Sequence, residues 1–209
     1  MIPSYEPHRL VIKHLSVLES APSIVAEVEK KVFSAIDEKI KEWVESRGDW
    51  EGVFNFLDDE TSFKPKVWEN DPSGDYGSYY ELDYEAGEEC KHYLSPLLAV
   101  VPIKFGIWFS VNASWVTGQN GKVARPSAAW QNYLAGKLPY TKLVELGFEL
   151  RGASIFLPIR IDSELLADDY PNSLDDALEP VDQALKKLDA AHVEIDALLK
   201  AARDYQFSK

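Results

Sequence analysis

Three carboxylates occupy every second position of a short segment in the middle of the chain. Glu81, Asp83 and Glu85 alternate there with aromatic and apolar residues. Alternate side chains of a β-strand share one face, so this spacing predicts three carboxylates side by side on a sheet. Carboxylate oxygens are the ligands that Mg²⁺ and Ca²⁺ prefer, and paired carboxylates can also perform acid–base chemistry. One hypothesis is therefore a small metal-dependent enzyme that uses these strand carboxylates.

The surrounding residues favour a simpler interpretation of the same strand. A metal-dependent nuclease typically carries a lysine two residues beyond a strand carboxylate, where it stabilises developing charge. Positions 85 and 87 hold Glu and Gly instead. The strand also lies in the most acidic part of the chain, which would repel a nucleic-acid substrate. We therefore expect the charged members of each alternating strand to face water.

Other motifs that carry chemistry give no specific signal. The sequence holds no phosphate-binding glycine-rich loop and no G-x-S-x-G nucleophile elbow. Cys90 and His92 stand two residues apart, but a zinc site needs about four ligands and no second Cys/His pair is nearby. His192 lies on the apolar side of the last predicted helix, where we expect a packing role. We predict no cofactor and no metal, and a binding protein rather than an enzyme.

The charge of the chain is unevenly distributed. The formal net charge is −13, and residues 45–89 carry 14 acidic and 3 basic side chains, whereas residues 90–160 carry 2 acidic and 8 basic ones. A net charge of this sign argues against nucleic acid as a direct ligand, because proteins bind it by neutralising phosphates. An acidic surface can serve solubility alone. It can also dock on a basic partner surface, as inhibitory nucleic-acid mimics do.

The sequence thus predicts an acidic interaction or inhibitor-type protein that docks on a basic protein surface. The expected binding residues lie on the acidic strand and its flanking turns: Asp58, Asp59, Glu60, Glu69, Asp71, Asp75, Glu81, Asp83 and Glu85. A homo-oligomer held by the complementary acidic and basic segments is an alternative assembly. A non-catalytic accessory subunit is a third alternative, beside the metal-dependent enzyme.

Composition sets the class of protein. Hydrophobic residues make up 45% of the 209 residues, and Cys90 is the single cysteine, so no intramolecular disulfide can form. The N-terminus lacks the continuous apolar segment of a signal peptide. The longest apolar run, residues 97–103, is far shorter than the ~20 residues that a membrane span needs. We expect a soluble, cytoplasmic protein with no membrane partner, and one α+β domain over residues 1–209.

Hydrophobic periodicity predicts the elements. Helical spacing predicts a long helix over residues 23–47, capped by Ser23, and another long helix from Ser173, with Pro180 near its first turn or at a kink. Residues 9–15 and 53–57 read as short strands, 63–68 as an edge strand because of Pro65, and 127–138 as a short helix. Further strands are expected over 78–85, 104–112, 148–151 and 154–161. Consecutive strands predict a mainly antiparallel sheet, packed by the two long helices and one or two short central ones.

Overall fold

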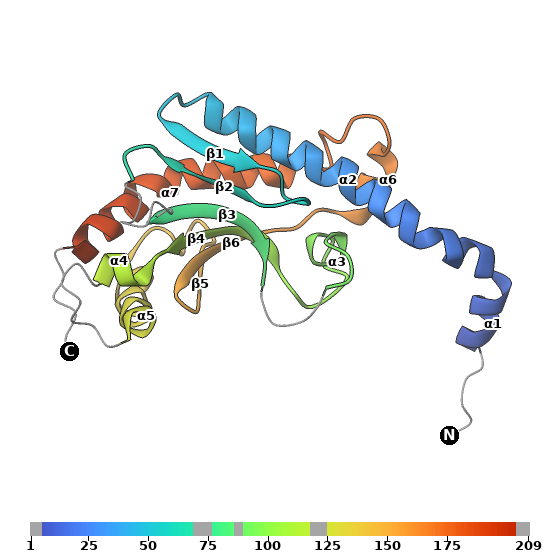
Figure 1. Ribbon diagram of the computed structural model, residues 1–209, viewed down its shortest axis with the longest axis horizontal. Coiled ribbons are helices and arrows are strands. Elements are labelled where there is room, and N and C mark those ends of the chain that lie inside the picture. The colour runs from blue at the N-terminus through green and yellow to red at the C-terminus, as the bar shows by residue number, and fades with distance from the viewer. Residues whose placement is uncertain (1–5, 69–76, 86–89, 118–124, 204–209) are drawn as a thin grey trace, which may run out of the picture.

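Six strands form one antiparallel sheet in the computed structural model, which describes residues 6–68, 77–85, 90–117 and 125–203 (Figure 1). Their order across the sheet is β1-β2-β3-β4-β6-β5, and every neighbouring pair is antiparallel. The strands are β1 (Trp50–Phe54), β2 (Thr61–Pro65), β3 (Ser78–Tyr84), β4 (Phe105–Val111), β5 (Glu149–Arg151) and β6 (Ser154–Ile159).

Two long helices pack on this sheet, α2 (Leu15–Glu45) and α7 (Glu179–Arg203). The shorter helical elements are α1 (Glu6–Lys13), α3 (Leu94–Leu97), α4 (Ala113–Thr117), α5 (Pro126–Lys137), the 3₁₀ helix η1 (Leu138–Tyr140) and α6 (Ser163–Asp169). The predicted α+β class is confirmed: an antiparallel sheet carries a long N-terminal helix and a long C-terminal helix.

The period-two pattern of the strands explains which face the helices cover. Tyr80 and Leu82 of β3 are buried, and so are Ile107 of β4 and Leu157 of β6, which follow Leu82 across the sheet. These side chains belong to the same apolar core as Phe33 of α2. Burial of such alternating apolar side chains is the main force that holds an amphipathic helix against a sheet.

The C-terminal half of α2 is tied to α7 by charge and by aromatic packing. Lys39 Nζ lies 3.1 Å from Asp182 Oδ2, and Arg47 pairs with Asp189. His192 of α7 packs against the rings of Trp50 and Trp68, with centroids 4.9 and 5.6 Å away. The prediction that His192 is a packing residue is confirmed.

The N-terminal prediction was wrong. Residues 9–15 are not a strand, because α1 and the start of α2 occupy them. Pro22 lies inside α2, and the Ser23 hydroxyl donates to the Ser20 carbonyl instead of capping a helix. A proline within a helix removes one backbone donor and does not always end it. The apolar spacing of a helix in fact extends N-terminally to Leu10.

Three further expectations are corrected. β2 is not an edge strand, since it lies between β1 and β3; Pro65 is its last residue, where a missing N–H disturbs the ladder least. Lys64 does not face water: its side chain is 2% exposed, and its ammonium donates to the Trp68 carbonyl at 2.7 Å. The last helix begins at Glu179, not at Ser173, and Pro180 sits in its first turn, where proline is tolerated.

Candidate partner-binding surface

The sheet has a second face, which we call the outer sheet face, that turns away from the apolar core. Alternation places Glu81 and Asp83 of β3 on it, with Trp108 of β4 opposite Glu81 and Phe156 of β6 opposite Trp108. The Trp108 and Phe156 ring centroids are 4.4 Å apart, and both residues lie outside the core cluster. The outer sheet face therefore has its own small aromatic contact beside the strand carboxylates.

The turn between β1 and β2 is acidic and brings Glu60 beside this face. Asp58, Asp59 and Glu60 are all exposed in this turn, which is closed by the hydrogen bond from Asn55 N to Glu60 O at 3.0 Å. Glu60 Oε1 accepts a hydrogen bond from Ser62 Oγ at 2.9 Å. Ser62 in turn lies opposite Glu81 in the β2–β3 pairing. We call the group Asp58, Asp59, Glu60, Glu81 and Asp83 the acidic patch.

Glu81 is the most constrained carboxylate of the acidic patch. It is half-buried, and the Ser110 hydroxyl donates to its Oε1 at 2.7 Å. Burial raises its pKa, and the negative charges of Asp83 and Glu60 raise it further, against the lowering effect of the Ser110 hydrogen bond. The ionised carboxylate is thus held among like charges, which disfavours its charged form.

Partial burial also raises the pKa of Asp83 and of Tyr79. Asp83 is exposed, yet partial burial of its carboxylate raises its pKa, opposed by a hydrogen bond from Tyr84 N at 2.8 Å. Burial, together with Glu81 and Glu60, raises the pKa of Tyr79 to about 12. The Tyr79 hydroxyl therefore stays protonated at physiological pH, and it hydrogen-bonds to Glu81.

Glu85 belongs to a different electrostatic environment. Arg151 Nε lies 3.2 Å from Glu85 Oε1, and Arg151 also pairs with Glu149, which Lys104 Nζ contacts at 2.8 Å. The hydrogen bond from Lys104 is the main cause that lowers the pKa of Glu149. Two cations of the basic segment are thereby paired within the chain. Glu85 is neutralised by this network, unlike the carboxylates of the acidic patch.

The nine predicted binding residues therefore fall into three groups. Five form the acidic patch, Glu85 is paired with Arg151, and Glu69, Asp71 and Asp75 lie outside the described residues. We did not identify Ser62, Ser110 and Tyr79 from the sequence as residues that contact these carboxylates. The alternation within each strand is visible in the sequence, but the order of the strands, which brings these residues together, is not.

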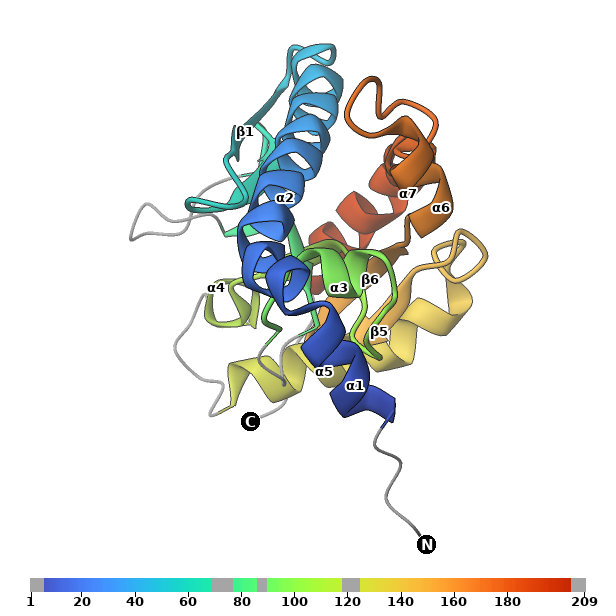
Figure 2. The same cartoon turned by 90° about the vertical axis from the view of Figure 1, so that its right-hand side faces the viewer.

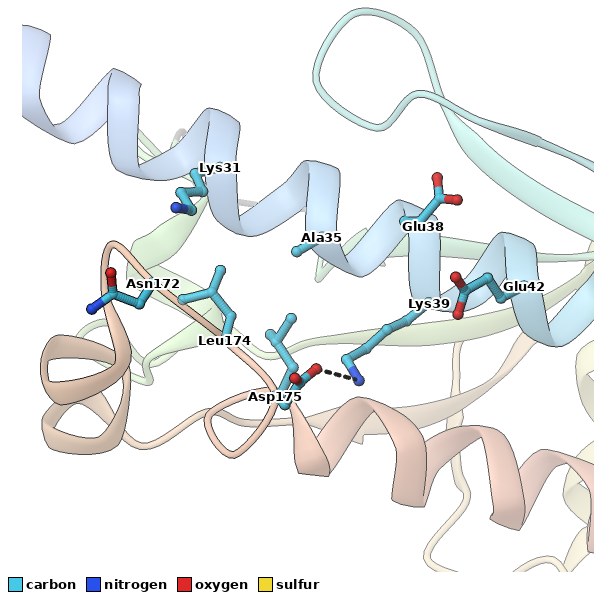
Figure 3. A pocket seen from close by; sticks show the side chains of 9 residues that line it. Lys31, Ala35, Glu38, Lys39, Glu42, Asn172, Leu174 and Asp175 are labelled. Atoms are coloured by element: carbon cyan, nitrogen blue, oxygen red, sulfur yellow. Dashed lines mark ion pairs between the residues drawn. The ribbon is translucent and has the colours of Figure 1, made fainter.

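A hollow lies between α2 and the segment before α7 (Figure 3). Lys31 and Lys39 of α2 line it together with Asn172, Leu174 and Asp175. Lys39 Nζ lies 3.6 Å from Asp175 Oδ1, so these two opposite charges are paired with each other. The residues that line the hollow form no catalytic arrangement.

Metal-holding geometry is likewise not found in the part of the chain that the structure describes. No three His, Cys, Asp or Glu side chains come together there in a group that could hold an ion. His92 of the Cys90–His92 pair instead lies beside Glu29, whose Oε2 is 3.9 Å from His92 Nδ1.

The chain matches no known family, no curated protein and no solved structure at a significant level. None of the described helices combines the length and apolarity needed to cross a membrane. What the chain does must therefore be inferred from its own residues and contacts.

Proposed function

We propose that this chain is a binding protein whose acidic patch docks on a basic surface of a macromolecular partner. The observation that carries this proposal is that Glu60 of the β1–β2 turn lies close to Glu81 of β3, which brings the exposed turn that carries Asp58, Asp59 and Glu60 beside the strand carboxylates Glu81 and Asp83. Grouped like charges destabilise a folded chain. A complementary basic surface removes that penalty on binding and steers the encounter of the two partners.

Aromatic residues beside the acidic patch support a protein partner. Trp108 and Tyr79 are partly exposed, and Trp108 Nε1 donates to the Asp83 carbonyl at 3.1 Å, which fixes the indole next to the carboxylates. Tyrosine and tryptophan dominate the binding energy of many interfaces because they bury large areas with few rotatable bonds. An aromatic centre rimmed by carboxylates suits a basic surface that also presents apolar or cationic side chains.

A finer proposal concerns the kind of basic surface. Carboxylates at alternate positions of an extended strand are about 6.6 Å apart along it, so Glu81 and Asp83 present negative charges in a regular row. Such a row can take the place of backbone phosphates on a protein that binds nucleic acid. The chain would then act as an inhibitor that competes with nucleic acid, without binding it directly.

A matched pair of charge-reversal variants tests the proposal. Asp58→Lys, Asp59→Lys and Glu60→Lys reverse the turn of the acidic patch, whereas Glu164→Lys, Asp168→Lys and Asp176→Lys reverse three exposed carboxylates near α6 and α7. Both triple variants have the same net charge. In quantitative affinity capture from the native cell, partners of the wild type should be lost with the first variant and kept with the second.

Equal loss of the partner from both variants would show that only the net charge matters, and equal retention by both would show that neither surface is needed. Either result would refute docking through the acidic patch. The finer proposal has its own test, in which a DNA duplex is titrated into the purified complex. Displacement of the chain by the duplex supports a nucleic-acid-binding partner, and persistence of the complex contradicts it.

A further inference from the structure

An exposed helical segment extends from the body of the protein. We call residues 6–27, formed by α1 and the first turns of α2, the N-terminal arm. Every residue from 7 to 20 is exposed, and the first buried residue of α2 is Val32. Figures 1 and 2 show α1 and the start of α2 reaching away from the sheet and from α7. The arm therefore contributes little to the core of its own chain.

The arm nevertheless carries the sequence pattern of a packed helix. Apolar pairs recur every seven residues, as Leu10–Val11, Val17–Leu18 and Ile24–Val25. The first pair lies in α1 and the other two lie in α2, beyond the turn at His14. Within a helix, this spacing keeps apolar side chains on one side and is typical of helices that pack along another helix. The small residue Ala21 lies between the second and third pairs, where it permits a close approach.

The exposed apolar area is too large to be ordinary. Seven large side chains of the arm are between 45% and 75% exposed: Leu10, Val11, Ile12, Leu15, Val17, Leu18 and Ile24. Single exposed apolar side chains are ordinary on a protein surface, but a run of them marks an interaction surface. A helix as short as α1, with 8 residues, is also marginal in water without tertiary packing. Both facts indicate that another surface covers the arm.

The charges of the arm identify that surface. The charged residues of α1 are Glu6, Arg9 and Lys13, with a net charge of +1, whereas those of the arm's α2 part are Glu19 and Glu27. The α1 part of the arm is thus net basic and the α2 part acidic. Suppose that two arms pack antiparallel, with Leu18 of one near Leu18 of the other across a twofold axis. The basic part of each arm then lies beside the acidic part of the other.

A membrane surface fits the arm less well. Glu19 and Glu27 flank its apolar residues, and the chain as a whole carries a net charge of −13. Anionic lipid headgroups attract basic helices and repel acidic ones. The complementary halves of the arm instead match a second copy of the same sequence.

We infer that the chain forms a homodimer through antiparallel packing of its N-terminal arms. The interface is isologous, as in most soluble dimers, so each copy contributes the same apolar pairs and the same two charged halves. This contact uses none of the acidic-patch residues and leaves that surface available. It is also distinct from pairing between the acidic and basic central segments of two chains.

Sedimentation equilibrium of the full chain tests this inference, with an expected mass of twice 23.6 kDa. The double substitution Val17→Asp and Leu18→Asp should weaken self-association by about tenfold or more, because it places charge at the centre of the interface. Val193→Asp is the matched control, since Val193 is 77% exposed on α7, away from the arm. Its dimer should remain unchanged, and circular dichroism should show both variants folded.

A charge-exchange experiment distinguishes a second copy from any other occupant. Arg9→Glu with Lys13→Glu makes an all-acidic arm, and Glu19→Lys with Glu27→Lys makes a basic one. Each variant alone should be mainly monomeric, and their equimolar mixture should form a heterodimer. A monomeric wild type or a mixture that stays monomeric would overturn the inference. Binding of a monomeric wild type to phosphatidylcholine–phosphatidylserine vesicles through the arm would overturn it in favour of a membrane surface.

Discussion

Glu81 shows at the scale of one residue how the acidic patch is held together. Partial burial and the negative charges of Asp83 and Glu60 raise its pKa, while the Ser110 hydroxyl at 2.7 Å supplies a compensating donor. A carboxylate in such surroundings costs folding free energy when it is ionised. A carboxylate whose pKa is raised by its surroundings is a candidate for a role other than stability.

The substitution Glu81→Gln should stabilise the protein at neutral pH, because the amide oxygen can still accept from Ser110 and the charge is gone. The folded-state pKa of Glu81 is raised, so the wild type loses its penalty as pH falls through that pKa. The stability gain of the variant should therefore shrink in acid. Urea unfolding at neutral pH and at about pH 4.5 measures both differences.

Glu85→Gln is the matched control for that experiment. It removes the partner of Arg151 Nε at 3.2 Å, and it should destabilise by no more than about 1 kcal/mol, as expected for a partly exposed ion pair. A Glu81→Gln variant less stable than the wild type at neutral pH would show that the ionised carboxylate is favourable and that its burial among like charges carries no penalty.

His192 provides a second pH response with the opposite sign. Burial between Trp50 and Trp68 lowers the pKa of His192, and the positive charge of Arg47 lowers it further. The negative charges of Asp196, Asp49 and Asp189 raise it, but they do not offset the effect of burial. Charging this imidazole is harder in the folded state than in the unfolded chain. Stability that is complete above the unfolded-state pKa of about 6.5 should thus decline as pH falls through that value.

The variant His192→Gln should lack this part of the pH dependence, whatever stability it loses through packing. Chemical unfolding between about pH 7.5 and pH 5.5 covers the relevant range. Val193→Gln, on the exposed side of the same helix, gives the control and should keep the wild-type slope. An unchanged slope in His192→Gln would place the pH response elsewhere.

At the scale of elements, the close approach of β4 and β6 limits what the sheet can accommodate. Gly106 lies opposite Pro158, and a Cβ atom added to it would meet the Leu157 carbonyl at 2.1 Å and Phe156 Cε2 at 2.9 Å. The carbonyl is part of the backbone and cannot rotate away. The glycine therefore allows the two strands to pair while Phe156 packs over β4.

Gly106→Ala should destabilise by about 2 kcal/mol or more, since β4 and β6 must separate to relieve the contact. Gly136→Ala on α5 is the contrasting change, because no atom lies within 4 Å of its added Cβ. The better helix propensity of alanine should there add about 0.5–1 kcal/mol. Thermal unfolding of the two variants compares them directly, and a tolerated Gly106→Ala would contradict the β4–β6 geometry.

The elements also show what sequence patterns can and cannot predict. Alternation over residues 78–85 and 104–112 correctly predicted β3 and β4, because one face of each is buried. The same reasoning failed for Lys64, whose burial depends on the Trp68 carbonyl and on Glu51, 3.4 Å away on the neighbouring strand. Proline misled the prediction at Pro22 and Pro65, since its effect depends on whether tertiary packing needs the missing donor.

At the scale of the whole molecule, the protein has two differently built sides. The two long helices cover one sheet face (Figure 1), while the outer sheet face carries Glu81 and Asp83 and a separate aromatic pair. Sequence spacing could predict that Glu81 and Asp83 share a face. It could not predict that the turn with Glu60 lies beside them, because that requires the β2–β3 register, nor that Arg151 pairs with Glu85.

The affinity of the purified partner at different salt concentrations is the most direct test of docking through the acidic patch. Binding of the wild type should weaken steeply from about 0.05 M to 0.5 M salt, as charges at an exposed interface are screened. The Asp58→Lys, Asp59→Lys, Glu60→Lys variant should bind far more weakly at low salt and show a shallower dependence, and the variant at Glu164, Asp168 and Asp176 should follow the wild type. Identical affinities and identical salt dependences for all three proteins would contradict docking through this surface.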